Sequence, residues 1–298
     1  MHTVYYFYLV IIVFLLVQCS EKAEVHISYP KEQPDSIALF FLPNIVSRPD
    51  SLDFNSAFSN DGKLFYFARS QGGKYDIYQT AFEGNTWQTP VLAPFSTTEY
   101  SEADPFIVPD GSIYFISDKP KDALDTIGDF DIWVIHPEKN GTWSTPQNIQ
   151  EVNSDSTEYY VSLSSNGNLY FASNRPGGYG SHDIYVSRFV NDKYSTPVNL
   201  GPAVNTTEME HDPFISRDER FIIFTSVNRP DGFGQGDLYY ATRKAVDAPW
   251  SSSTNLGERF NTPTYEYCSY LTPDNEFFFY SSDYDVKWIS AEKLPIKN

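Results

Sequence analysis

The sequence predicts an all-β fold: a single five-bladed β-propeller of four-stranded blades, closed by an outer strand from the N-terminus. Three observations predict it. A turn followed by a run suited to a buried strand occurs five times, at intervals of roughly 50 residues, as in propeller blades. Each copy continues through a polar loop to an Asp that begins a second apolar strand. The 20 Pro and 16 Gly among 298 residues favour short strands and many turns over helices.

The first residues are expected to be a targeting segment outside the fold. The apolar run from Val4 to Val17 is too short to span a bilayer comfortably and suits a secretory signal, predicted over residues 1–18. The sequence Leu16-Val17-Gln18-Cys19 resembles a bacterial lipobox, which implies that Cys19 becomes lipidated. A plain secretory signal and a retained anchor are the alternatives. Residues 19–36 are polar and suit a tether, and residues 37–298 are expected to form the propeller.

The closing strand is predicted from a mismatch in strand numbers. Five innermost strands occur, but only four outer segments follow their blades. The apolar run at residues 37–42, IALFFL, precedes the first blade. We expect it to supply the fifth outer strand, because this would remove the open edges of the array.

Within each blade, the strands are predicted from short apolar runs. Runs that are apolar at every position indicate burial on both faces. The second strands are expected at 64–67, 113–116, 169–172, 221–224 and 277–280. The third strands are expected to begin at Asp76, Asp131, Asp183, Asp237 and Asp285. A fourth segment starts with an aromatic residue and often contains Pro, which suits an edge strand; it begins at Trp87, Trp143, Tyr194 and Trp250.

Two segments carry a resemblance to a known repeat. The stretches SLSSNGNLYFASNRPGGYGSHDIYVSRF and DPFISRDERFIIFTSVNRPDGFGQGDLYY resemble the WD40-like repeat of TolB-type β-propellers. The resemblance covers about residues 37–290 and is strongest in the third and fourth blades. It implies a periplasmic or surface protein of a Gram-negative bacterium that binds partners through the faces of a propeller. It implies no single reaction, because this fold hosts many functions.

An acidic residue recurs eight positions before each turn. The five are Asp53, Glu102, Glu158, Glu210 and Glu266. The position marks the start of the innermost strand, so we expect these carboxylates to ring one mouth of the central channel as a ligand-binding site. Asp104 and Asp212, two residues after their acids, are expected to point the same way, because side chains alternate along a strand.

Two interpretations of this acidic ring stay open. The oxygens could hold Ca²⁺, or a Lys or Arg of a partner. Alternatively, each acid could be a structural residue that accepts hydrogen bonds from the preceding loop, for instance from Asn153, Asn205 or Asn261. No cofactor other than this possible Ca²⁺ is expected.

Other residues are expected to be structural. Arg175 and Arg229 should pair with the Asp that begins the third strands. Cys268 lacks a catalytic context and is expected to be a small buried residue, and neither His182 nor His211 has a metal-type partner at close spacing.

Charge and composition restrict the function. The formal net charge is −18, which argues against binding to nucleic acid or anionic lipid surfaces. The sequence therefore favours a non-enzymatic binding or scaffold propeller of the cell envelope, at the outer membrane or in the periplasm. Its partner would be a protein, peptide or glycan, and only a lipid anchor would hold it to the membrane. The alternative is a glycosidase or lyase that uses channel-mouth carboxylates.

Overall fold

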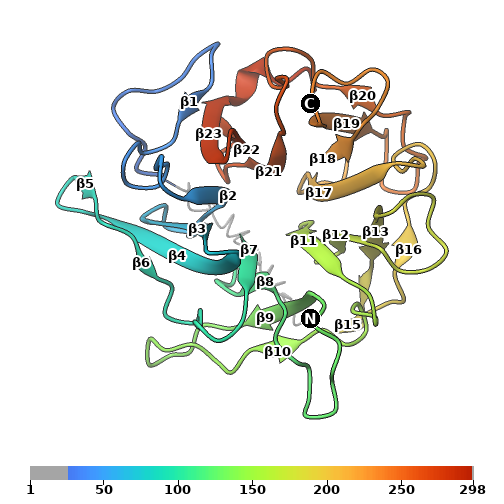
Figure 1. Ribbon diagram of the computed structural model, residues 1–298, viewed down its shortest axis with the longest axis horizontal. Coiled ribbons are helices and arrows are strands. Elements are labelled where there is room, and N and C mark those ends of the chain that lie inside the picture. Colours follow the sequence, from blue (N-terminus) through green and yellow to red (C-terminus); the bar gives the residue numbers. More distant parts are fainter. Residues whose placement is uncertain (1–25, 297–298) are drawn as a thin grey trace, which may run out of the picture.

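The computed structural model describes residues 26–296, in which five antiparallel sheets are arranged as blades around a central axis (Figure 1). The all-β prediction is confirmed, since the single helical element of the described chain is the 3-10 helix η1 (Ala291–Lys293). No helix within residues 26–296 has the length and apolar character needed to cross a membrane.

Each blade runs from an innermost strand at the channel to a short outer strand. Blade 1 contains β2 (Leu52–Phe58), β3 (Leu64–Gln71), β4 (Lys74–Glu83) and β6 (Val91–Leu92), with β5 (Thr86–Trp87) extending β4. Blade 2 contains β7 (Glu102–Ile107), β8 (Ile113–Ser117), β9 (Asp131–Ile135) and β10 (Gln147–Asn148). Blade 3 contains β11 (Glu158–Leu163), β12 (Leu169–Ser173), β13 (Asp183–Ser187) and β16 (Val198–Asn199), beside the hairpin of β14 (Phe189–Val190) and β15 (Lys193–Tyr194). Blade 4 contains β17 (Met209–Ile215), β18 (Phe221–Val227), β19 (Gly236–Thr242) and β20 (Thr254–Asn255).

Blade 5 joins the two ends of the chain, as the sequence predicts. It contains β21 (Tyr267–Leu271), β22 (Phe277–Ser282), β23 (Asp285–Ser290) and, from the N-terminal region, β1 (Leu39–Phe40). Leu39 pairs with Trp288 in the β1–β23 ladder. Just beyond β1, the Phe41 backbone N–H donates to the carbonyl of Val286 at 2.8 Å. The predicted closing strand is therefore confirmed, with regular pairing over two residues.

Every innermost strand contains a β-bulge that the sequence reading did not anticipate. The register shifts in all five pairs of innermost and second strands. At each shift, a residue other than glycine adopts a left-handed backbone, with φ between 45° and 65°. These bulge residues are Asn55, Asp104, Tyr160, Asp212 and Cys268. Because a bulge adds a residue and bends its strand, simple alternation of side chains fails here.

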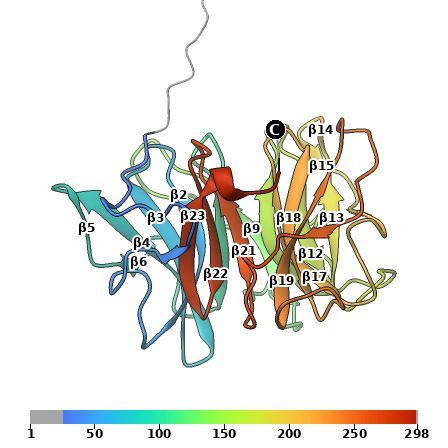
Figure 2. The same ribbon diagram turned by 90° about the horizontal axis from the view of Figure 1, so that it is seen from above.

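The two faces of the propeller are defined by the ends of the innermost strands. The entry face is where the innermost strands begin, and the turn face is where they turn back into the second strands. The C-terminal end lies at the turn face together with the β14–β15 hairpin (Figure 2).

Residues 26–29 pack on the turn face instead of hanging free. Ile27 is buried, the Trp87 indole Nε1–H donates to the carbonyl of Ser28 at 3.0 Å, and the Tyr29 hydroxyl donates to the Asp274 carboxylate at 2.9 Å. The C-terminal part of the predicted tether (residues 19–36) therefore contacts the propeller, through the side chains of Ile27 and Tyr29 and the backbone of Ser28. The signal segment and Cys19 lie outside the described residues.

Candidate functional site

The five recurring acids are buried inside their own blades. Their exposed fractions are 0–2%, for Asp53, Glu102, Glu158, Glu210 and Glu266. None of them lines the cavity at the channel mouth. The expectation that they face a ligand there is therefore not what the geometry supports.

Glu158 illustrates how each acid is held. Its carboxylate accepts hydrogen bonds from the Ser154 backbone N–H at 3.1 Å, the Ser154 hydroxyl at 2.7 Å and the Ser173 hydroxyl at 2.8 Å. The Arg175 guanidinium donates to it at 2.8 Å. Burial raises the pKa of Glu158, although these donors and the Arg175 charge oppose that effect. The carboxylate ties the preceding loop to the second strand.

The same arrangement recurs in the next blade. Glu210 accepts from the Thr206 backbone N–H and hydroxyl, both at 2.7 Å, and from the Ser226 hydroxyl at 2.6 Å. The Arg229 guanidinium lies 3.3 Å from the same carboxylate. The hydrogen-bonding interpretation of the repeated acids thus accounts for their positions.

Two details of the sequence interpretation are corrected. Asn153 does not donate to Glu158: its side-chain amide pairs with both backbone groups of Ile132, each at 2.9 Å, and the donor to the acid is the following residue. Arg175 and Arg229 pair with Glu158 and Glu210, and not with the Asp residues that begin the third strands. In blade 3 that Asp, Asp183, accepts backbone N–H groups of its own preceding loop.

A cavity of about 560 Å³ opens at the entry face, over the central channel. Seven aromatic residues contribute to its lining: Phe54, Tyr75, Phe130, Tyr159, Tyr265, Tyr267 and Tyr284. Its charged lining residues are Asp104, Asp212 and Asp283, and no Lys or Arg is among the lining residues. A ligand that enters would meet aromatic walls and buried carboxylates.

Two of the predicted site residues, Asp104 and Asp212, are brought together through Cys268. The Cys268 thiol lies 3.3 Å from Asp212 Oδ2 and 4.0 Å from Asp104 Oδ1, and its backbone N–H donates to Asp212 Oδ2 at 3.0 Å. All three are bulge residues, from blades 2, 4 and 5. The left-handed backbone, and not strand alternation, is what directs them toward one another.

His211 extends this cluster. Its Nδ1 lies 2.9 Å from Asp212 Oδ1, and its Nε2 lies 2.6 Å from the Tyr265 hydroxyl. Below the cluster, the Tyr160 hydroxyl donates across the channel to the carbonyl of Ser269 at 2.6 Å, linking blade 3 to blade 5. The cavity therefore has a floor of hydrogen-bonded side chains.

The two carboxyl groups of this floor have pKa values shifted in opposite directions. Burial, together with repulsion from Asp212, raises the pKa of Asp104 well above its ordinary value. Burial would also raise the pKa of Asp212, but His211 and the hydrogen bonds from Cys268 outweigh it and lower that pKa. The pair thus favours one proton, on Asp104, and one negative charge, on Asp212.

Across residues 26–296, no group of three or more His, Cys, Asp and Glu side chains is arranged to hold a metal ion. The five repeated acids already accept hydrogen bonds from protein donors, and the Ca²⁺ site considered from the sequence stays a prediction.

The sequence reading missed His211, Cys268 and the aromatic wall as parts of a site. The sequence contains a signal for the first two. Cys268 lies two residues after the repeated acid of its blade, and His211 directly precedes the residue at the same position in blade 4. That position varies among Asn, Asp, Tyr, Asp and Cys, whereas the acid itself does not vary in charge. Variation at one repeat position marks the asymmetric part of the ring.

Comparisons with known proteins support the fold. No family model and no curated protein matches the sequence. Among solved structures, the chain is similar to a TolB-like structure from Agrobacterium tumefaciens, at 18% identity and TM-score 0.52, covering 85% of this chain and 82% of that one. It is also similar to an α-L-arabinanase from Penicillium chrysogenum complexed with arabinobiose, at 15% identity and TM-score 0.51, covering 88% and 86%. Against TolB from Acinetobacter baumannii it covers 80% of its own length and 54% of that chain, at 14% identity and TM-score 0.49.

Proposed function

We propose that this protein is a non-enzymatic binding propeller of the bacterial cell envelope whose entry-face cavity receives a Lys or Arg side chain of a protein or peptide partner. The composition of the cavity carries the proposal: aromatic walls, three Asp and no Lys or Arg among its lining residues. Aromatic faces and carboxylates both attract an organic cation, and aromatic rings also pack against the methylene stem of Lys or Arg.

The floor of the cavity favours a positively charged group over a neutral sugar. Asp104 and Asp212 are only 6% and 7% exposed, and no Lys or Arg forms an ion pair with either of them among the described residues. A buried carboxylate gains most from a partner that brings an opposite charge, because the interaction is weakly screened. Asp212 already has His211 Nδ1 at 2.9 Å, and a neutral glycan would bring no further positive charge to this floor.

Affinity for a cationic probe is expected to rise with pH. We expect the peptide Gly-Lys-Gly to bind and its Nε-acetylated form to bind at least about tenfold more weakly, since a charge-assisted contact is lost. The pKa of Asp104 is raised in the free protein, and a bound ammonium would lower it, so binding releases a proton. Affinity should therefore increase as pH rises toward that raised pKa, which calorimetry at several pH values would measure.

Variants separate the contributions to this pH dependence. Asp212→Asn should weaken binding, and Asp104→Asn should remove its part of the pH dependence, whereas exposed Asp247→Asn should change neither. His211→Gln is the third variant, because it removes the imidazole that contacts Asp212. Equal affinity for the acetylated and unacetylated peptides would contradict the cationic ligand.

Membrane attachment is proposed to occur through lipid on Cys19. Replacing Cys19 with Ala should move the protein from the membrane to the soluble fraction of a Gram-negative host, as judged by fractionation. A Cys19→Ala variant that stays with the membranes would contradict lipid anchoring, while Ser20→Ala serves as the matched control.

A second candidate function is a carbohydrate-active enzyme. The observation that favours it is the opposite shift in the pKa values of Asp104 and Asp212 within one cavity, a pattern that assigns an acid and a base. One similar structure is an arabinanase with a bound arabinobiose. Release of reducing ends from arabino-oligosaccharides, lost in Asp212→Asn, would favour the enzyme over the binding module.

A further inference from the structure

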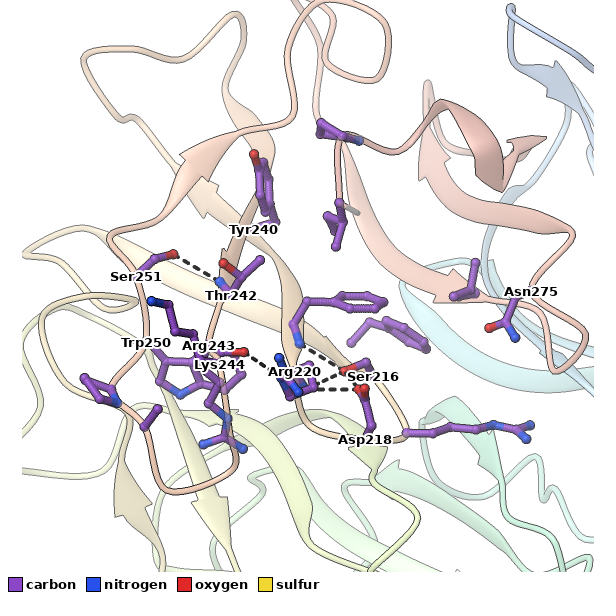
Figure 3. A pocket seen from close by; sticks show the side chains of 18 of the residues that line it. Ser216, Asp218, Arg220, Tyr240, Thr242, Arg243, Lys244, Trp250, Ser251 and Asn275 are labelled. Atoms are coloured by element: carbon purple, nitrogen blue, oxygen red, sulfur yellow. Dashed lines mark hydrogen bonds between the residues drawn. The ribbon is translucent and has the colours of Figure 1, made fainter. Parts of the chain in front are cut away.

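A second, larger cavity lies on the turn face, between blades 4 and 5. It has a volume of about 980 Å³. The β17–β18 turn, the segment that follows β19 and the β21–β22 turn supply its walls, and Pro295 and Ile296 complete it (Figure 3). This cavity is therefore on the face opposite to the acidic one.

Its charge is opposite to that of the rest of the molecule. Arg217, Arg220, Arg243 and Lys244 line it, against a single acid, Asp218. The whole chain has 21 Lys and Arg against 39 Asp and Glu. An excess of cations in one cavity of so acidic a protein is a local feature that the overall charge does not produce.

Three of these four cations have no ion-pair partner among the described residues. Arg243 is neutralised, since its guanidinium lies 2.8 Å from the Glu219 carboxylate. Arg217, Arg220 and Lys244 are exposed and form no salt bridge within residues 26–296. Asp218 is occupied by the Ser216 hydroxyl at 2.8 Å. Three cations without an ion-pair partner among the described residues thus line one cavity.

Arg220 and Arg243 are held in place by contacts within blade 4. The Arg243 guanidinium stacks on the Trp250 ring, 4.2 Å from the ring centroid. The backbone carbonyl of Arg243 accepts the Arg220 Nε–H at 2.8 Å. The Arg220 backbone N–H donates to the Ser216 hydroxyl at 2.9 Å. Arg220 is therefore held through its Nε while its terminal amino groups keep free donors, so little order has to be gained on binding.

We infer that this cavity is a binding site for a phosphate-bearing ligand. A phosphate dianion offers several acceptor oxygens, which suits separate cationic side chains from two neighbouring connections of blade 4. The apolar lining by Phe214, Leu271 and Ile296 can take the carbon part of such a ligand. The net charge of −18 gives no long-range attraction for an anion, so affinity must come from these local contacts.

The phosphate could belong to a soluble molecule or to a lipid headgroup. Tyr29 hydrogen-bonds Asp274, whose neighbour Asn275 lines the cavity, so the N-terminal segment docks beside it. If Cys19 is lipidated, the seven residues from Cys19 to Val25 can span at most about 25 Å, which would keep this face near the membrane. The two sources therefore need separate arms in one experiment.

The test is calorimetric titration of the full chain with inorganic phosphate, at low salt and with sodium chloride at equal ionic strength as the blank. We expect saturable binding that the double variant Arg220→Gln with Lys244→Gln weakens at least about tenfold, because charge-assisted contacts are lost. Lys193→Gln, an exposed Lys on the β14–β15 hairpin, is the matched control and should bind like the parent. Lys244→Arg should retain binding, since it keeps the charge.

Each outcome has a defined consequence. Unchanged phosphate affinity in the double variant, with an unfolding curve like that of the parent, would overturn the site, as would the absence of saturable binding in the parent. Cosedimentation of a Cys19→Ser chain with phosphatidylglycerol vesicles, but not with phosphatidylcholine vesicles, and its loss in the double variant would assign the lipid source. Phosphate binding without vesicle binding would assign a soluble ligand.

Discussion

Deletion of residues 37–42 is expected to destabilise the whole propeller more than any single substitution. This segment contains β1 and Phe41, and it forms the outer strand of blade 5. Without it, the outer edge of β23 would be unpaired and the aromatic core beneath it would be open to water. An exposed, unpaired edge also invites association with other chains, so the truncated protein should aggregate on unfolding.

Phe41 is the residue in this segment on which most of the loss should depend. It is fully buried, with its ring centroid 4.7 Å from that of Phe65, 4.9 Å from that of Phe279 and 5.4 Å from that of Trp288. These rings come from blades 1 and 5, so Phe41 joins the first blade to the last. Phe41→Ala should lower the free energy of unfolding by about 3–5 kcal/mol, through lost burial and the cavity left behind.

The adjacent residue supplies the control. Phe40 is 43% exposed, and Phe40→Ala should cost within about 1 kcal/mol, because little buried area is lost. Urea unfolding followed by tryptophan fluorescence would measure both variants and the deletion. A deletion that unfolds at the same urea concentration as the full chain would show that the ring does not need its N-terminal strand.

The fold could be predicted because the signal repeats. Five copies of a turn and two apolar runs, with four aromatic outer segments, specify blade number and strand order, and the one missing outer strand identifies its replacement at residues 37–42. Local apolar patterning determines which segments are strands, and strand pairing follows from closure. The bulges could not be predicted, because the left-handed backbone of Asp104 or Tyr160 has no sequence signature comparable to a glycine.

The candidate site was predicted only in part for the same reason. Asp104 and Asp212 were placed at the channel by counting from the repeated acids, and they do line the cavity. The repeated acids themselves do not, because the bulge after each one sends acid and bulge residue in different directions. The aromatic wall combines residues from separate loops, such as Tyr75 and Tyr265, whose proximity depends on how the blades are arranged around the channel.

The Glu158→Gln substitution is expected to destabilise the protein by about 1–3 kcal/mol, the cost of leaving buried donors unsatisfied. Glu158 accepts from Ser154, Ser173 and Arg175 with both of its oxygens. A glutamine would turn one acceptor into a donor that faces other donors, and it would leave Arg175 without its counter-charge. Burial raises the pKa of Glu158, so the carboxylate itself is penalised; the loss should come from the orphaned donors.

Pairing this change with its equivalent in blade 4 distinguishes architecture from ligand binding. Glu158 and Glu210 share no hydrogen-bond partner, so the losses in Glu158→Gln and Glu210→Gln should add, to about 2–6 kcal/mol in the double variant. Exposed Glu208→Gln, two residues from Glu210, is the matched control and should change the free energy of unfolding by less than about 0.5 kcal/mol. If the repeated acids instead repelled one another around a ligand site, each neutral variant would be as stable as the parent or more stable, and millimolar Ca²⁺ would raise the melting temperature of the parent more than that of the variants. Because each carboxylate is already enclosed by donors of its own blade, we expect additive losses and no response to Ca²⁺ or EDTA. Urea unfolding and calorimetry on the parent, the two single variants, the double variant and the control would measure both.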